Sequence, residues 1–404
     1  MPGIIRITGT ERSGTVSDII DPQPPVSSYR LTPEIQESYS TTYAYDEAGQ
    51  LMEAVDGETG KTYRYTYDAS GNIQTARTYT VSPNGNEALI DETTYQYVNG
   101  ILCGYASSTK GNVTYQTDQM GNPTVIGFDT LTWGEGRMLT GIRRNAQNYT
   151  AYTYNADGLR AAKAVVKNGI TTNTHYVWGD NGLAAAITGN QTVVVLYDAE
   201  GESVGFSVNE TVYTYVKNFQ GDVIRILDED GTAVVSYTYD PWGVPTVSGD
   251  ADLAAINPCS YRGYYYDQET GYYYLQSRYY DPEIGRFLNT DDTEMICTDQ
   301  GGITQYNLFL YCQNNAISNS DPTGYGRLTV ILKVSFLRRW CGRLCSMIAK
   351  AIALYIFKGA KWAGVIGAAL GWIIGRTLAQ WMIKKDIRLS VYIPFMPTRT
   401  WTLY

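Results

Sequence analysis

The sequence predicts a mainly β protein, built from repeated hairpins and followed by a small, helical, cationic C-terminal region. Its composition favours strands, because 36 of the 404 residues are Tyr and only 8 are Phe, beside 40 Gly. Tyr suits a pleated, half-exposed surface, where the ring packs and the hydroxyl group finds a polar partner. The many Gly residues indicate frequent turns.

The first half of the chain repeats a short motif. Two Tyr residues alternate with other residues, Asp or Asn follows, and Gly stands three positions later, as in the segment from Tyr65 to Gly71. Alternating Tyr presents its rings to one face of a strand, Asp or Asn starts a turn, and Gly takes the positive φ that strains other residues. A short period repeated many times predicts a stacked β architecture. The clearest copies begin at Tyr43, Tyr65, Tyr152 and Leu196, and weaker ones at Tyr95, Tyr115 and Tyr176.

The charge is divided unevenly along the chain. The net charge is −9, but the residues from Gly326 onward hold 13 Lys and Arg against one acid, Asp386, a balance of +12. Residues 1–325 hold the other 18 bases and 39 acids, a balance of −21. This asymmetry indicates two parts with different tasks, of which the acidic one can neutralise the basic one.

Metal and cofactor chemistry is not expected. The six Cys residues are scattered without a CxxC pair, and the chain has a single His, which makes a zinc site improbable. The first residues lack the apolar run of a signal peptide, so export would need another route or a missing upstream region.

Two segments, 257–292 and 306–326, are dense in aromatic residues, Gly, Arg and Asp-Pro turns. In the first segment, residues 264–266 and 272–274 flank a turn that Gly271 closes, which predicts a hairpin. Further back, residues 223–239 read as a strand, an Asp-Gly turn and a second strand.

These two segments closely resemble the Rhs repeat-associated core, and the repeats resemble the tyrosine-aspartate (YD) repeats of the Rhs/YD family. The resemblance implies YD-repeat β-hairpins that coil into a shell-like sheet around the chain's own C-terminus. It divides the chain into a YD-repeat β-shell segment at 1–256, a core at 257–325 and a variable tail at 326–404.

The resemblance also implies self-cleavage. In that family the core cuts the chain after a DPxGL-like motif, by chemistry that resembles an aspartic protease, in which two carboxylates divide the acid and base roles. The matching positions are Asp321 and Asp291, with Arg286 to polarise the scissile carbonyl or hold a carboxylate ionised. Tyr325 stands where Leu is usual, and we expect cleavage between Tyr325 and Gly326. The alternative is that these residues only shape turns and form salt bridges.

The tail contains a long apolar stretch. Residues 362–383 carry one charge, Arg376, and as a helix they would span about 33 Å, close to the hydrocarbon thickness of a bilayer. Trp362 and Trp381 stand near its ends between flanking Lys residues, which is typical of a membrane segment. Small residues at every fourth position favour close approach of helices in lipid. They are Gly359, Ala363, Gly367, Gly371 and Gly375.

The rest of the tail fits the same interpretation. Residues 328–357 mix basic and apolar residues, like a cationic helix that seeks a membrane surface. The tail has no His, no Glu and one Asp, which argues against nucleases that use His and against zinc deaminases. Alternatives are a buried helix of a small domain, a hydrophobic segment held in the shell, and a nucleic-acid binder.

The function expected from the sequence is that of a C-terminal part of a bacterial polymorphic toxin with a membrane-disrupting tail. Its expected partners are the bacterial membrane, an immunity protein and a delivery or secretion apparatus, with no specific nucleic acid. It would be secreted or lie at the cell surface. The alternatives are a cell-surface contact protein anchored by its C-terminal helix, and an inactive gene fragment.

Overall fold

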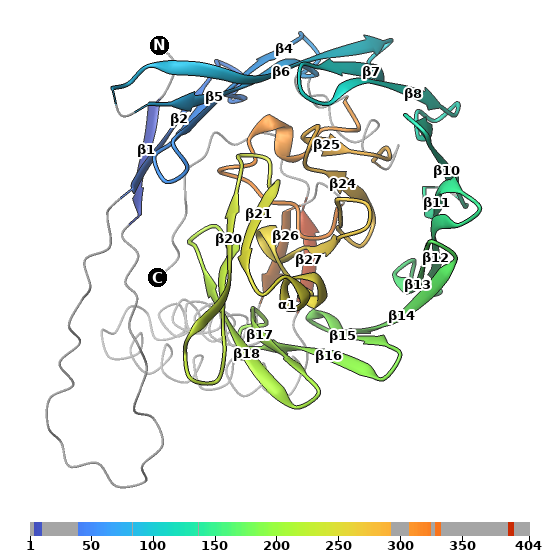
Figure 1. The fold of residues 1–404 in the computed structure, drawn as a ribbon. Coiled ribbons are helices and arrows are strands. Elements are labelled where there is room, and N and C mark those ends of the chain that lie inside the picture. Colours follow the sequence, from blue (N-terminus) through green and yellow to red (C-terminus); the bar gives the residue numbers. More distant parts are fainter. Residues whose placement is uncertain are drawn as a thin grey trace, which may run out of the picture. The chain divides into compact units, whose positions relative to one another are not determined.

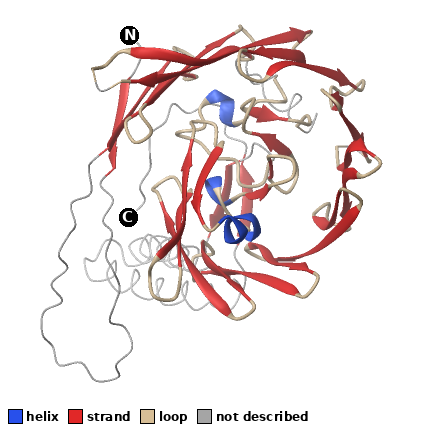
Figure 2. Cartoon of the chain, in the orientation of Figure 1, coloured by secondary structure: helices blue, strands red, loops and turns tan. Residues whose placement is uncertain are grey.

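The computed structural model describes residues 4–9, 39–82, 84–135, 137–291, 307–324, 328–332 and 387–391. The chain divides into two compact units, Met1–Gly326 and Arg327–Tyr404. Strands dominate the described residues, and the helical segments among them are short (Figure 2). The mainly β class predicted from the sequence is confirmed.

A 21-stranded antiparallel sheet makes up most of the first unit. Each strand pairs with the next one along the chain, from β1 with β2 to β20 with β21, and the strip curves in Figure 1. The strands are β1 (Ile4–Gly9), β2 (Tyr39–Tyr45), β3 (Leu51–Asp56), β4 (Lys61–Tyr67), β5 (Ile73–Val81), β6 (Glu87–Val98), β7 (Ile101–Ser107), β8 (Gly111–Thr117), β9 (Pro123–Ile126), β10 (Asp129–Trp133), β11 (Leu139–Asn145), β12 (Asn148–Tyr154), β13 (Arg160–Lys167), β14 (Ile170–Gly179), β15 (Gly182–Thr188), β16 (Gln191–Tyr197), β17 (Ser203–Val208), β18 (Thr211–Lys217), β19 (Val223–Leu227), β20 (Ala233–Tyr239) and β21 (Pro245–Gly249).

One turn geometry recurs between these strands. At Asp68, Oδ1 accepts the backbone N–H groups of Ser70 and Asn72 over 2.8 and 2.9 Å, and Gly71, at φ +79°, donates its N–H to the Asp68 carbonyl. The predicted roles of Asp or Asn and of Gly in the repeat are therefore confirmed. The same pattern is found at Asp46, Asp118, Asn155, Asp198, Asn218, Asp228 and Asp240.

The tyrosine before several of these turns ties adjacent strands together. At the end of β4, the Tyr67 hydroxyl donates to the carbonyl of Leu51, the first residue of β3, over 2.5 Å. Equivalent bonds join Tyr154 to Leu139 and Tyr239 to Val223. This is the arrangement that favours Tyr over Phe, because the ring packs on the sheet and the hydroxyl satisfies a carbonyl at a strand start.

The core segment forms a second, four-stranded antiparallel sheet. Its strands are β22 (Tyr265–Asp267), β23 (Tyr272–Tyr274), β24 (Tyr279–Asp281) and β25 (Arg286–Phe287), so the hairpin predicted around Gly271 is confirmed. It is preceded by helix α1 (Ala251–Ile256), whose N-terminus is capped by the side chain of Asp250. Short 3-10 turns lie at Tyr261–Gly263 and Cys312–Asn314.

The core packs against the long sheet along most of its length. One hydrophobic cluster joins Tyr65 and Trp242 with Tyr273 and Tyr280 of the core. A second joins residues of β14 to β20 with α1 and Cys259, and a third joins β10 to β12 with β23 and β24. The core is thereby fixed to strands from both ends of the sheet.

In the second unit, the described residues form the antiparallel pair β26 (Leu328–Leu332) and β27 (Ile387–Val391). The helix expected from residue 328 is wrong for β26, where Thr329, Val330 and Ile331 are β-branched and fit a strand better. The predicted membrane segment, with Gly359, Trp362, Gly367, Gly371, Gly375, Arg376 and Trp381, lies outside the described residues. Among the residues that are described, no helix has the length and apolar character needed to span a membrane.

Candidate functional site

One buried arginine contacts both predicted catalytic aspartates. Arg278 stands just before β24 and is 2% exposed. Its Nη2 atom lies 3.1 Å from Oδ2 of Asp291 and 3.1 Å from Oδ2 of Asp321. Burial lowers the pKa of Arg278, and the two carboxylates oppose that shift. The structure therefore brings the two aspartates together through a shared guanidinium group.

The same guanidinium group holds the backbone next to the predicted cleavage site. Nε of Arg278 donates to the carbonyl of Gly324, and Nη1 donates to the carbonyl of Leu308 over 3.2 Å. The guanidinium carbon of Arg278 lies 3.5 Å from the centre of the Phe287 ring, so this ring covers one face of the guanidinium group. Arg278 thus connects both carboxylates with the residue that directly precedes Tyr325.

The segment that carries Asp321 is held tightly at this place. The N–H of Asp321 donates to the hydroxyl oxygen of Tyr264 over 2.9 Å, and Oγ of Ser277 donates to the carbonyl of Thr323 over 2.7 Å. Gly324 has φ +72°, and a Cβ atom there would lie 2.7 Å from the Leu275 carbonyl oxygen. Only glycine fits this position, which explains the glycine of the Asp-Pro-Thr-Gly motif.

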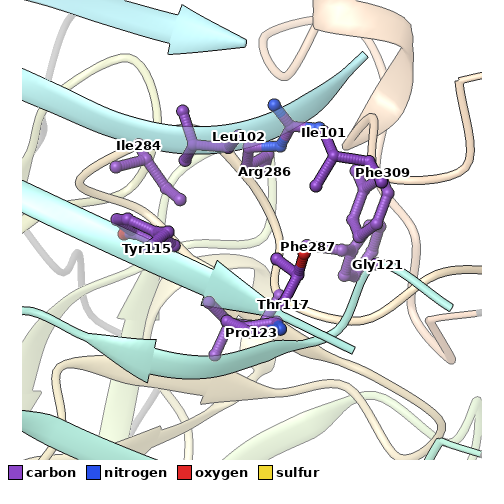
Figure 3. Close-up of a pocket in the computed structure, with 11 residues that line it drawn as sticks. Ile101, Leu102, Tyr115, Thr117, Gly121, Pro123, Ile284, Arg286, Phe287 and Phe309 are labelled. Carbon is purple, nitrogen blue, oxygen red and sulfur yellow. The ribbon is translucent and has the colours of Figure 1, made fainter. Parts of the chain in front are cut away.

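The other predicted site residues lie elsewhere. Arg286 is in β25 opposite Asp281, and its guanidinium carbon lies 5.2 Å from the Tyr97 ring centre and 5.1 Å from that of Phe309. It lines a small cavity of 20 Å³ together with Leu102 and Tyr115 (Figure 3). The cleavage residues Tyr325 and Gly326 lie outside the described residues. In the described part of the chain, no group of three or more His, Cys, Asp and Glu residues could hold a metal ion.

Sequence reasoning chose Arg286 and missed Arg278, although a signal for Arg278 exists. Strands β24 and β25 pair with Asp281 opposite Arg286 and Tyr280 opposite Phe287. Counting back along this register sets Arg278 opposite residue 289, two positions from Asp291. A hairpin turn at residues 281–286 therefore places Arg278 close to the segment that carries Asp291.

A second buried ionic cluster anchors the core to the long sheet. Arg160 at the start of β13 donates to Oδ2 of Asp267 over 2.6 Å, and Lys163 donates to Oδ1 over 2.7 Å. Lys163 also pairs with Glu269 at 2.8 Å. Burial raises the pKa of Asp267, but the charges of Arg160 and Lys163 lower it by more, so the pKa lies below its ordinary value. Burial raises the pKa of Glu269.

Tyrosine rings surround the Arg160 guanidinium group. Those of Tyr274, Tyr176 and Tyr265 have their centres 4.4, 4.7 and 5.0 Å from its carbon. Such ring faces attract a cation electrostatically. Because these rings come from both the sheet and the core, the cluster fixes the core hairpin on β13.

The repeated Tyr-Asp turns, the strand-by-strand meander and the docked core define a YD-repeat β-shell protein. A family model described as Teneurin YD-shell matches residues 21–317. The chain belongs to this family.

Curated relatives carry the same kind of sequence over most of this chain. The tRNA3(Ser)-specific nuclease WapA of Bacillus spizizenii is 33% identical over 70% of this chain and 12% of its own length. The tRNA nuclease WapA of Bacillus subtilis is 30% identical over 86% of this chain and 14% of its own length. Toxin subunit YenC1 of Yersinia entomophaga is 27% identical over 71% of this chain and 29% of its own length. The chain therefore matches only a small part of these much longer proteins.

Proposed function

We propose that this chain is the C-terminal part of a bacterial Rhs-type polymorphic toxin, whose β-shell and core hold an effector that self-cleavage releases. The observation that carries the proposal is the contact of Arg278 with Asp291, Asp321 and the Gly324 carbonyl. The toxin subunit and the tRNA nucleases among the relatives support a toxic role.

The proposed reaction is hydrolysis of the peptide bond between Tyr325 and Gly326. One carboxylate of the pair Asp291 and Asp321 accepts a proton from a water molecule as the water oxygen attacks the Tyr325 carbonyl carbon. The other carboxyl group, protonated, gives its proton to the Gly326 nitrogen as the carbon–nitrogen bond breaks. Arg278 holds both carboxyl groups and the preceding carbonyl in position.

Intact mass of the purified chain tests this proposal. The wild-type chain is expected to give two fragments, 1–325 and 326–404, whereas Asp321→Asn, Asp291→Asn and Arg278→Lys should stay intact. Arg286→Lys is the matched control, because that arginine contacts Tyr97 and Phe309 and should leave cleavage unchanged. A wild-type chain that remains a single species of full mass would refute self-cleavage.

The released tail is proposed to disrupt membranes. The support is the apolar stretch 362–383 with its basic and tryptophan flanks. Dye leakage from anionic liposomes is expected with the cleaved wild-type chain, and it should fall with Asp321→Asn and with Gly371→Leu. Because two relatives are tRNA nucleases, the same preparation should also be incubated with tRNA. Degradation of tRNA without leakage would replace the membrane proposal by a nuclease effector.

A toxin that is released by cleavage needs partners that deliver it and that protect the cell producing it. We expect an immunity protein that neutralises residues 326–404, a delivery or secretion apparatus, and a secreted or cell-surface location. The competing function is a cell-surface contact protein anchored by its tail. Fractionation of producing cells separates the two, because an anchored protein stays uncut in the producer's membrane fraction, whereas the toxin leaves it after cleavage.

A further inference from the structure

Several repeat turns contain buried amide side chains. In three turns the residue after the glycine is Gln50, Asn72 or Asn122, which are 6%, 1% and 0% exposed. Each donates its side-chain N–H to the aspartate that starts its own turn, over 2.8, 2.9 and 3.0 Å. Because the NH₂ side of each amide is occupied by the turn, its oxygen remains for a partner from elsewhere.

Asn314 of the core uses the first of these oxygens. Its Nδ2 atom donates to Oε1 of Gln50 over 2.8 Å and to the carbonyl of Gly71, in the second turn, over 2.6 Å. Asn314 is 1% exposed, so water does not replace these bonds. One core amide therefore bridges two successive repeat turns.

Asn307 uses the second oxygen in the same way. Its Nδ2 atom donates to Oδ1 of Asn72 over 2.7 Å and to the carbonyl of Ser70 over 3.1 Å. A later turn shows a related contact, because Asp222, also after a turn glycine, accepts the backbone N–H of Arg262 over 2.8 Å. Polar side chains after the turn glycine thus repeatedly bind the core.

The backbone around Asn314 needs such support. Cys312, Gln313 and Asn314 all have positive φ, at 50°, 54° and 61°. This left-handed conformation costs energy for most residues other than glycine; Asn tolerates it best, so the cost falls mainly on Cys312 and Gln313. The two bonds of the Asn314 side chain stabilise a local conformation that the main chain alone disfavours.

We propose that Asn307 and Asn314 are positioning residues of the self-cleavage site. They fix segment 307–324 on two repeat turns and so set Asp321 against Arg278. This inference rests on the proposed self-cleavage. It also gives the repeat turns between β2 and β3 and between β4 and β5 a specific task beyond forming the sheet, which is to dock the segment that carries Asp321.

The variant Asn314→Asp tests the inference. It keeps the side-chain size but replaces the donor by a carboxylate that faces the oxygens of Gln50 and Gly71. The rate of self-cleavage is expected to fall about tenfold or more. A factor of ten corresponds to about 1.4 kcal/mol, which is within the usual cost of losing a buried hydrogen bond. Gln313→Glu is the matched control, since it adds the same charge at an exposed position next to Asn314.

A compensating variant separates positioning from a general loss of stability. With Asp46→Asn in the Asn314→Asp chain, the Gln50 amide can turn over, accept from the new amide at position 46 and donate to the carboxylate at 314. Part of the lost rate should return. Asn155 and Asn218 already start turns of this geometry, so the substitution at 46 is compatible with the fold. If the double variant folds well but its rate of self-cleavage does not recover, the proposal is overturned.

Hydrogen exchange makes the two proposals distinguishable. In the uncut Asp321→Asn chain, added Asn314→Asp should speed amide exchange of residues 312–324, and added Gln313→Glu should not. If the wild-type chain never cleaves, the proposed function fails while exchange still tests the positioning. If Asn314→Asp does not fold, the partly buried Asn307→Asp takes its place. Unchanged exchange and unchanged cleavage would overturn the inference.

Discussion

Arg160 of the long sheet and Asp267 of the core form an ion pair of 2.6 Å whose side chains are 1% and 0% exposed. Lys163 adds a second positive charge to the same carboxylate at 2.7 Å. Ions removed from water in this way depend on each other, because neither can recover its hydration while the fold persists. The pair joins β13 to the end of β22, and so the attachment of the core depends on it.

Asp267→Asn is expected to destabilise the fold by about 3–5 kcal/mol, because it leaves Arg160 and Lys163 buried without a full counter-charge. Chemical denaturation of the two chains measures the difference in the free energy of unfolding. Asp129→Asn is the control, since its partner Arg144 is 52% exposed and that pair should contribute less than about 1 kcal/mol. Equal losses in both variants would contradict the assignment of the cluster as the core's anchor.

The stability should decline as pH rises from about 5 to 8. Burial, with the charge of Glu283, raises the pKa of Asp281 to about 7, and burial raises that of Asp240 to about 6. The folded state then binds protons more tightly than the unfolded chain, whose carboxyl groups titrate near pH 4, so ionisation on raising the pH favours unfolding.

Asp281→Asn should remove part of this pH dependence. The amide oxygen can still accept the N–H of Glu283, which Oδ1 of Asp281 accepts at 3.0 Å. At pH 8 the variant is expected to be about 1–3 kcal/mol more stable than the wild-type chain, with little difference at pH 5. Melting temperatures of the wild-type chain and of Asp281→Asn between pH 5 and pH 8 measure this difference. Asp157→Asn is the control, because Asp157 is exposed. An unaltered pH slope would show that Asp281 does not titrate there.

Two turn glycines with the same backbone should respond differently to alanine. Gly221 and Gly243 have φ +89° and +96°, but a Cβ atom meets nothing within 4 Å at Gly221 and lies 2.6 Å from the Tyr261 ring at Gly243. Gly221→Ala should cost about 1–2 kcal/mol for the positive φ alone. Gly243→Ala should cost about 1–3 kcal/mol more from the clash. Thermal unfolding compares the two, and equal costs would mean that the Tyr261 ring shifts freely.

The aspartate that starts each turn should be replaceable by asparagine but not by alanine. Asp68 accepts two backbone N–H groups and the amide of Asn72. Asp68→Ala leaves these donors without their acceptor and should cost about 1–3 kcal/mol. Asp68→Asn keeps Oδ1 for the two backbone N–H groups, as the natural turns at Asn155 and Asn218 do, but its NH₂ group then faces that of Asn72. It should therefore cost less than Asp68→Ala without being neutral. Denaturant titration measures the free energy of unfolding of both variants. Equal losses would argue against Asp68 as the acceptor that stabilises the turn.

The sheet could be predicted from sequence because its determinants are local. The Tyr-x-Tyr-Asp-x-x-Gly motif contains the strand, the residue whose side chain caps the turn and the glycine at positive φ within a few positions. The hairpin closed by Gly271 has the same local character, and both are present in the structure.

The site was only partly predictable, for reasons of distance along the chain. Asp291 and Asp321 stand out through the resemblance of their motifs, but the arginine between them is indicated only by the register of two short strands around residues 281–286, which those motifs do not contain. Arg160 and Asp267 are 107 residues apart, and neither stands in a motif that points to the other. In the tail, β-branched residues at 329–331 form a strand where the charge pattern favoured a helix.

The neighbour-only pairing of the long sheet has a consequence for the order of folding. Each hairpin needs only a short loop to close, so its contact order is low and it can form while synthesis is still under way. The bond from Asn314 to Gln50 spans 264 residues and cannot form until almost all of the first unit has left the ribosome. Asp321, on the segment that Asn314 anchors, therefore docks against Arg278 after the sheet is complete, and the proposed self-cleavage would act only on a finished sheet.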